Sequence, residues 1–226
     1  ADGDGDDQVL AIEARHFFAH AVHAARGFPM VLAGEIHQRV FGSVGDEDDR
    51  PAVAAVACSA LAAAELVGEL KGLQGPEGVA VAADGRVLVT NTRGGNISVF
   101  RDGRLERTVG RPGTRDGEFS HPHDIDVAPD GTVYVVDSGN NRLQVFDAGL
   151  THRTSVGPEL KLSGPKYLSV NGQRLWLADE YNHRLLLLDR DLRLLGVLGT
   201  GRRGRGADAF YKPEAVVARA PYLWVI

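Results

Sequence analysis

Hydrophobic and polar positions follow two different patterns along this chain, and the change comes near Gly72. Before it, apolar residues recur at the spacing of one helix face. The first helical segment is expected to end near Gly27 and Pro29, since glycine and proline end helices, and a second to begin at Pro51, a favoured first helical position. The pattern therefore predicts an N-terminal helical extension over residues 1–72, whose Ala-rich second helix should pack against the rest of the fold or another chain.

Beyond this point apolar and polar residues alternate, as in strands with one buried face, and the chain begins to repeat itself. The repeats start at four prolines separated by 46, 43 and 48 residues, which are Pro76, Pro122, Pro165 and Pro213. A spacing of this size is typical of one four-stranded propeller blade. The chain therefore contains three whole repeats and the first two strands of a fourth.

Each repeat places turn-forming residues at the same points. A proline precedes the first strand, where a missing N–H costs little. The first two strands are separated by Asp84-Gly85, Asp130-Gly131 and Asn171-Gly172, which are strong hairpin signals. The second strand then runs into a turn that contains Asp137, Asn141 and Arg142 in one repeat and Asp179, Asn182 and Arg184 in the next. Because this set recurs from repeat to repeat, we interpret it as a structural turn rather than an acid/base site.

The combined pattern of P-x-x-[IVL]-x-V, D-G and [YLW]-V-x-D-x-x-N-x-R, followed by a hydrophobic third strand, resembles the NHL repeat. The resemblance covers about two thirds of the chain. The first repeat departs from it, with Asn91 and Asn96 where the others have Asp and Arg. The resemblance implies a mainly β fold, an NHL-type β-propeller whose blades occupy residues 73–226 and whose two faces serve as binding surfaces.

The number of repeats raises the question of how the propeller closes. Propellers of this family commonly have six blades, and a partial ring leaves sheet edges exposed. The propeller is therefore expected to be either partial or closed by other strands. One source is Ile36–Val44, which resembles the last two strands of a degenerate repeat, and the other is a continuation of the protein beyond Ile226.

The residues that follow each repeat proline are the candidate binding site. In a propeller these positions lie where the inner strands enter the central channel, so side chains from several blades converge there. The candidate ligand-binding rim consists of Glu77, His121, His123, Asp124, Lys166, Tyr167 and Glu214. Such a set fits a small polar ligand, a partner protein or a metal, and it is also compatible with plain channel lining.

A metal at this rim is suggested by a second resemblance. Peptidyl-hydroxyglycine amidating lyases, which resemble NHL propellers, hold zinc on histidines at corresponding positions of separate blades. In this sequence only His123 matches, and its counterparts are Glu77, Lys166 and Glu214. A lysine facing the site counts against zinc.

A stripe of histidines near the N-terminus is the second candidate site. Glu13, His16, His20 and His23 have helical spacing, so on a helix they share one face. The three histidines, together with His37, could ligate Zn, Ni or Fe. A polar face or a protein interface is the alternative interpretation.

Charge argues against nucleic acid as the default partner. The net charge is −5 and the pI about 5.9, whereas affinity for nucleic acid comes mainly from cations that neutralise phosphates. The one basic cluster contains Arg202, Arg203 and Arg205 next to Phe210 and Tyr211, which leaves RNA as a minor alternative.

Cysteine usage and hydropathy exclude two further classes. A single cysteine, Cys58, rules out an intramolecular disulfide and leaves the compartment open. The longest apolar stretch, Ala52–Ala64, falls short of the roughly 18 residues of a membrane span. We therefore expect a non-enzymatic propeller scaffold that binds a protein partner or small ligand through its channel face and N-terminal helices. The alternative is a metal-dependent propeller enzyme of lyase or hydrolase type, and the cofactor stays undetermined.

Overall fold

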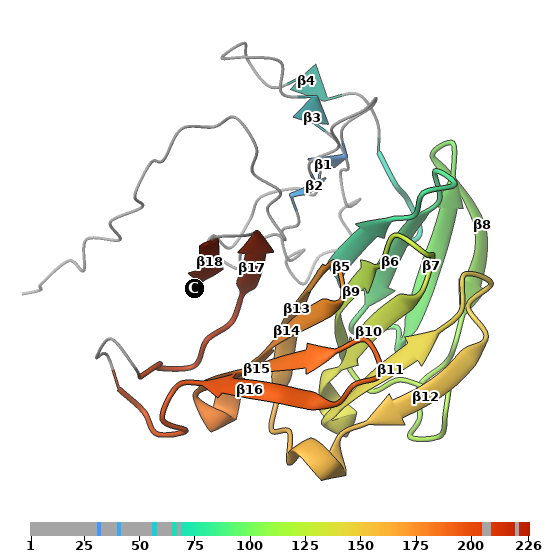
Figure 1. Ribbon diagram of the computed structural model, residues 1–226. Coiled ribbons are helices and arrows are strands. Elements are labelled where there is room, and N and C mark those ends of the chain that lie inside the picture. The colour runs from blue at the N-terminus through green and yellow to red at the C-terminus, as the bar shows by residue number, and fades with distance from the viewer. Residues whose placement is uncertain are drawn as a thin grey trace, which may run out of the picture.

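A computed structural model describes residues 31–32, 40–41, 56–57, 65–66, 69–204, 209–219 and 222–226. Its main body consists of antiparallel sheets arranged side by side (Figure 1). Blade 1 contains β5 (Pro76–Val81), β6 (Val87–Asn91), β7 (Asn96–Arg101) and β8 (Arg104–Val109). Blade 2 contains β9 (Pro122–Val127), β10 (Val133–Asp137), β11 (Arg142–Phe146) and β12 (His152–Val156). Blade 3 contains β13 (Pro165–Asn171), β14 (Arg174–Asp179), β15 (Arg184–Asp189) and β16 (Leu194–Leu198).

A fourth blade is represented by two strands, β17 (Val216–Arg219) and β18 (Tyr222–Val225), which pair with each other. Three short 3-10 helices lie between blade strands: η1 (Ser138–Asn140), η2 (Pro158–Leu160) and η3 (Glu180–Asn182). Within the described ranges no sheet closes into a ring. The same ranges contain no helix long and apolar enough to span a membrane.

The described part of the N-terminal region forms strands. β1 (Val31–Leu32) pairs with β2 (Val40–Phe41), and β3 (Val56–Ala57) pairs with β4 (Glu65–Leu66). The expected second helix is therefore wrong at β3 and β4, where strand pairing and the β preference of valine override the helix propensity of alanine.

The predicted closing segment, Ile36–Val44, is described only in part. Within Ile36–Val44, Val40–Phe41 pairs with Val31–Leu32, whereas β18 pairs with β17. The first predicted helix, the candidate metal ligands His16, His20, His23 and His37, and Cys58 all lie outside the described residues.

The repeat boundaries predicted from the prolines and turns are confirmed. β5, β9 and β13 begin at Pro76, Pro122 and Pro165. The hairpin glycines Gly85 and Gly131 have φ of 83° and 85°, in the region that glycine adopts at little cost.

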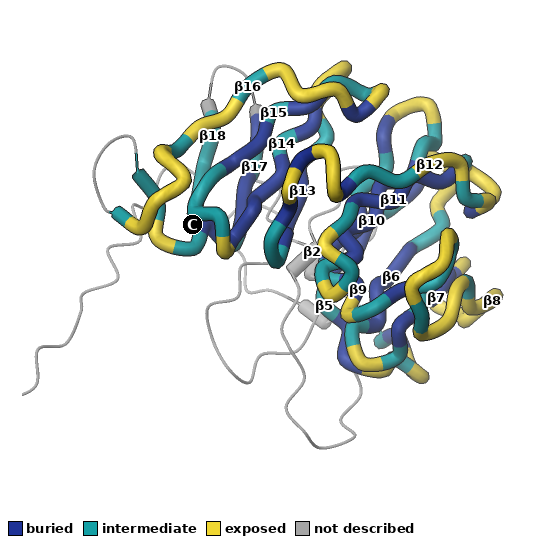
Figure 2. Tube along the Cα trace, turned by 90° about the horizontal axis from the view of Figure 1, so that it is seen from below, coloured by how far each residue is buried: buried dark blue, intermediate teal, exposed yellow. Residues whose placement is uncertain are grey.

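Neighbouring blades bury their facing surfaces against each other, and Figure 2 shows the buried residues gathered along the inner and middle strands. One hydrophobic cluster joins Leu88 and Ile97 of blade 1 to Ile125 and Val135 of blade 2. A second joins blade 2 to blade 3 through residues that include Tyr134, Val136, Leu168 and Leu177. Sheets stacked through such clusters, with the first strand of each innermost, are the architecture of a propeller.

The Asp…Arg turn holds each blade to the loop that precedes it. In blade 2 the Asp137 carboxylate is fully buried and accepts hydrogen bonds from Ser120 N (2.7 Å), Asn140 Nδ2 (2.8 Å) and Arg142 Nε (2.7 Å). The Arg142 guanidinium also donates to the carbonyl of Glu118 at 2.8 Å. The predicted structural role of this turn is confirmed by these contacts.

Blade 3 repeats the arrangement and blade 1 replaces it with neutral groups. Asp179 accepts from Arg184 Nε at 2.7 Å. In blade 1, Asn91 Oδ1 accepts from Gln74 N at 2.9 Å, while its Nδ2 donates to Asn96 Oδ1 at 2.7 Å. A pair of amides thus connects the same strands where the repeat elsewhere uses an ion pair.

Inner strands of adjacent blades are linked by side chains. Thr90 Oγ1 donates to the carbonyl of His123 at 2.9 Å, so it connects β6 to β9. The Asp124 carboxylate accepts from Leu168 N at 2.8 Å, and Ser169 Oγ accepts from Ala218 N at 3.2 Å. Each blade is therefore linked to the next by polar side chains on its first or second strand that bond to the backbone of the following inner strand.

An ion pair on the surface also bridges blades 2 and 3. Arg190 Nη2 lies 2.5 Å from Asp130 Oδ1, and its Nε lies 3.3 Å from the hydroxyl of Tyr134. The hydrogen bond from Arg190, reinforced by the Thr132 N–H, lowers the pKa of Asp130 to about 2.

The lowered pKa of Asp130 predicts a measurable pH dependence. Because the folded-state pKa lies below the usual 3.8, this contact stabilises the fold above about pH 4 and is lost as the pH falls toward 2. Arg190→Gln is expected to move the Asp130 titration midpoint, measured by carboxyl NMR, up toward 3.8. Arg193→Gln on the same hairpin, whose partner is the exposed Asp191, is the control and should leave it in place.

Candidate functional site

The candidate rim is built from equivalent positions of successive blades. Glu77, His123 and Lys166 are the second residues of β5, β9 and β13, and Glu214 comes shortly before β17. The strands approach closely here, since a Cβ added to Gly78 would lie 2.6 Å from the Cα of Asp124. A glycine at this position therefore allows blades 1 and 2 to bring their rim side chains together.

Glu77 and His123 form a carboxylate–imidazole pair. Glu77 Oε2 lies in direct contact with His123 Nδ1, and both side chains are 14% exposed. A carboxylate at Nδ1 orients the ring and leaves Nε2 as the atom that can meet a ligand. The two residues predicted to share the rim are thus in contact across two blades.

Tyr167 lies beside this pair in a negatively charged environment. The residue is only 4% exposed. Burial raises the pKa of its hydroxyl, and the carboxylates of Asp124, Glu77 and Glu214 raise it further. Carboxylates from blades 1 and 2 and from the segment before β17 therefore act on one neutral phenol, which can donate a hydrogen bond at any physiological pH.

Lys166 is turned toward a buried carboxylate that sequence reasoning missed. Its Nζ lies 3.8 Å from Glu180 Oε2, and Lys212 Nζ lies 3.3 Å from Glu180 Oε1. Glu180 is 3% exposed. It directly follows Asp179 of the repeat turn, where the other blades have Thr92 and Ser138. A carboxylate at a position that is otherwise a hydroxyl residue was the sequence signal that could have identified it.

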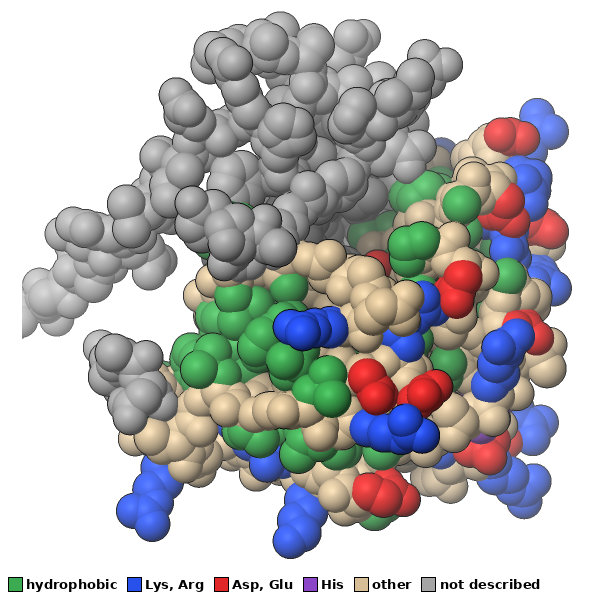
Figure 3. All heavy atoms as spheres, viewed as in Figure 1, with side chains coloured by type: hydrophobic (Ala, Val, Ile, Leu, Met, Phe, Trp, Pro, Cys, Tyr) green, Lys and Arg blue, Asp and Glu red, His purple; other side chains and the backbone are tan. Residues whose placement is uncertain are grey.

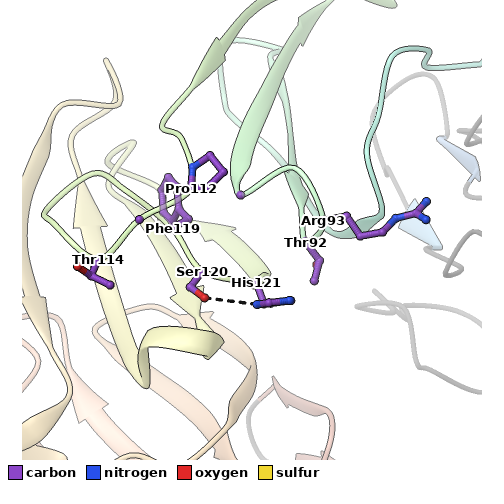
Figure 4. Close-up of a pocket in the computed structure, with 9 residues that line it drawn as sticks. Thr92, Arg93, Pro112, Thr114, Phe119, Ser120 and His121 are labelled. Atoms are coloured by element: carbon purple, nitrogen blue, oxygen red, sulfur yellow. Dashed lines mark hydrogen bonds between the residues drawn. The ribbon is translucent and has the colours of Figure 1, made fainter.

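His121 occupies a different place from the other rim candidates. It has a positive φ of 48°, is exposed, and its Nδ1 lies 3.3 Å from Ser120 Oγ. Figure 4 shows both residues at a pocket of about 190 Å³ between blades 1 and 2. Its other lining residues are Thr92, Arg93, Gly95, Pro112, Gly113, Thr114 and Phe119.

The basic cluster is a surface feature in the part that the structure describes. Arg203 stacks over the ring of Tyr211 at 4.2 Å, and Arg202 is exposed. Arg205 lies outside the described residues. Among the side chains that the structure places, no three His, Cys, Asp or Glu residues are arranged to hold a metal ion.

Two family models match parts of the chain. The NHL repeat matches residues 119–146, and the strictosidine synthase-like N-terminal domain matches residues 58–100. A comparison with curated protein sequences found no match.

Solved structures share the fold. A chain of a nidogen/laminin complex is 22% identical with a TM-score of 0.54, and the match covers 69% of this chain and 56% of that one. Virginiamycin B lyase from Staphylococcus aureus is 18% identical with a TM-score of 0.52, covering 67% and 48%. Hydrazine synthase from Kuenenia stuttgartiensis is 20% identical with a TM-score of 0.50, covering 67% and 42%. The chain spans about half the length of these structures.

The stacked four-stranded sheets and these structural matches define a β-propeller. The NHL match at residues 119–146 falls on its second blade, so the propeller contains an NHL repeat.

Proposed function

We propose that this chain is a non-enzymatic binding protein whose rim receives a cationic group of a small ligand or of a partner protein. The observation that carries the proposal is the contact of Glu77 with His123 across two blades, beside the buried Tyr167. The carboxylates of Asp124, Glu77 and Glu214 all contribute to raising the pKa of the Tyr167 hydroxyl, which indicates a negatively charged rim. A positively charged group is the ligand that a set of carboxylates accommodates best, since bringing a cation among them offsets their mutual repulsion. The Tyr167 hydroxyl oxygen could also accept a hydrogen bond from such a group.

The two lysines described near the rim contact a different carboxylate. Lys166 and Lys212 both face Glu180, so their ion pairs are made on the blade 3 side and not with Glu77 or Glu214. The Glu77 carboxylate contacts His123, whose imidazole supplies a full charge only when protonated. An amine or guanidinium on the ligand would complete this set of charges.

The metal-dependent enzyme receives less support from the described side chains. His123 is the single histidine in contact with a rim carboxylate, and no group of three ligands gathers in the described ranges. The N-terminal part of the predicted binding surface lies outside the described residues, so the proposal rests on the rim.

Titration calorimetry with putrescine, a small diamine, tests the proposal. Glu77→Gln and Glu214→Gln should each weaken binding roughly tenfold, which corresponds to about 1.4 kcal/mol. Raising the salt concentration should weaken binding further because it screens charges.

Glu106→Gln on the outer strand β8 is the matched control and should bind as the unchanged protein does. Putrescine that binds all four proteins equally, or binds none of them, would contradict the cationic-ligand proposal.

A further inference from the structure

The outer strand of blade 3 differs from the outer strands of blades 1 and 2. β8 carries Arg104, Glu106 and Arg107, and β12 carries His152 and Arg153. Charged side chains on an edge strand oppose pairing with another chain. β16 consists of Leu194, Leu195, Gly196, Val197 and Leu198 and has no charge at all.

This apolar strand is exposed at a sheet edge. In the described sheet β16 pairs with β15 alone, so its other side has no strand partner in this part of the chain. Its four large side chains are between 39% and 52% exposed. Figure 2 shows β16 running along the outside of the molecule as an exposed strand. In Figure 3 the hydrophobic side chains gather mainly toward β17 and β18, next to blade 3.

The order of apolar residues in β16 is symmetric about Gly196. Read outward from Gly196, Leu195 is mirrored by Val197 and Leu194 by Leu198. In an antiparallel pair of identical strands centred on Gly196, every apolar side chain would therefore face another apolar side chain. A symmetric dimer interface requires this kind of self-complementarity, in which residue i meets residue j and j meets i.

We propose that β16 is a self-association edge, at which a second copy of this chain adds its own β16 antiparallel and extends blade 3 into an eight-stranded sheet. Gly196 lies at the two-fold axis, and a glycine inside a strand often marks a place where another backbone approaches closely. Just beyond the strand, Arg193 faces Gly199 of the second copy, so no like charges oppose each other across the pair.

The outer strands of the other blades supply the contrast. Pairing a second β8 or β12 with the first would require the charged side chains of both copies to lose water, at a cost in pairing energy. All three outer strands contain a register shift against their neighbour, so charge is the protective feature that β16 lacks and the other two have. Among the three complete blades, self-association is therefore expected through blade 3.

Cysteine cross-linking tests the register directly. In a Cys58→Ser background, Gly196→Cys would place two thiols opposite each other, at the Cα separation of about 4.5–5.5 Å found for facing residues in antiparallel strands. This separation suits a disulfide. The site tolerates a side chain, since a Cβ at Gly196 meets no atom within 4 Å.

Mild oxidation of Gly196→Cys is expected to give a covalent dimer on a non-reducing gel. Thr154→Cys, at an exposed position on β12, is the matched control and should remain monomeric. Equal cross-linking of the two variants, or none at residue 196, would overturn the proposed register.

Sedimentation velocity tests the association without a cross-link. The unchanged chain should dimerise with increasing concentration, and Leu195→Lys should raise the dimer dissociation constant at least tenfold while circular dichroism shows the same fold. A chain that stays monomeric at 100 µM, or a dimer that Leu195→Lys leaves intact, would refute the proposal. Neither result depends on the rim residues. A failure of the dimer proposal can therefore be distinguished from a failure of the cationic-ligand proposal that the putrescine titration tests.

Discussion

Replacing Asp137 by asparagine is expected to lower the free energy of unfolding by about 3 kcal/mol, the cost typical of removing one partner from a buried ion pair. The carboxylate is fully buried and accepts four hydrogen bonds, including that of Arg142 Nε. An amide of the same shape donates where the carboxylate accepted, and it leaves the Arg142 charge without its counterion. Urea denaturation followed by circular dichroism measures the change.

The control for this prediction is an exposed aspartate. Asp191 pairs with Arg193 at 3.6 Å, and both side chains are about three-quarters exposed. Since exposed pairs contribute little, Asp191→Asn should change stability by less than about 0.5 kcal/mol. If Asp137→Asn were as mild as this control, the turn would not be the structural centre of its blade.

Replacing Gly78 by alanine is expected to destabilise the fold by about 1–3 kcal/mol, as overpacking of a tight interior site does. The added methyl would lie 2.6 Å from the Cα of Asp124 and 2.7 Å from the carbonyl oxygen of His123. Both neighbours are backbone atoms, so relief requires β5 and β9 to move apart. Thermal unfolding monitored by circular dichroism measures the loss.

The same substitution should weaken ligand binding at the rim, because separating β5 from β9 draws Glu77 away from His123. A reduced affinity for putrescine in Gly78→Ala is therefore expected alongside the lower stability. Gly196→Ala, in dilute solution where β16 is unpaired, is the control, since its Cβ meets nothing within 4 Å. Equal melting temperatures for the two variants would contradict the close approach at Gly78.

The repeat-based part of the fold could be predicted because each signal is local. A proline without an N–H belongs at the start of an inner strand, as at Pro122, and Asp130-Gly131 makes a hairpin whatever surrounds it. The structural role of the Asp137 turn could be predicted for the same reason. Asp137, its partner Arg142 and the Glu118 carbonyl that Arg142 contacts all lie within one repeat or the loop before it.

The N-terminal region shows where local signals fail. Residues 51–66 are rich in alanine and favour a helix on propensity, yet Val56–Ala57 and Glu65–Leu66 pair as strands. Strand pairing depends on a partner that the local sequence does not identify, and it overrides a weak propensity.

The candidate site was only partly predictable for a related reason. Equivalent repeat positions indicated that Glu77 and His123 would share a rim, and they are in contact. The repeat did not indicate that Lys166 would turn to Glu180, because that contact depends on a residue peculiar to blade 3 and on Lys212 from the following segment. The repeat pattern also did not indicate the positive φ of His121 or the pocket that it lines with Ser120.

The side-chain links between inner strands have a consequence for how this array would come apart. Strands within a blade share continuous backbone ladders, whereas neighbouring blades are joined by apolar packing and by a few side-chain links such as those of Thr90, Asp124 and Ser169. Under a pulling force the seams between blades should therefore yield before any sheet does, and each blade would separate as an intact unit. A change at one linking side chain should loosen one seam and leave the sheets on either side as they are.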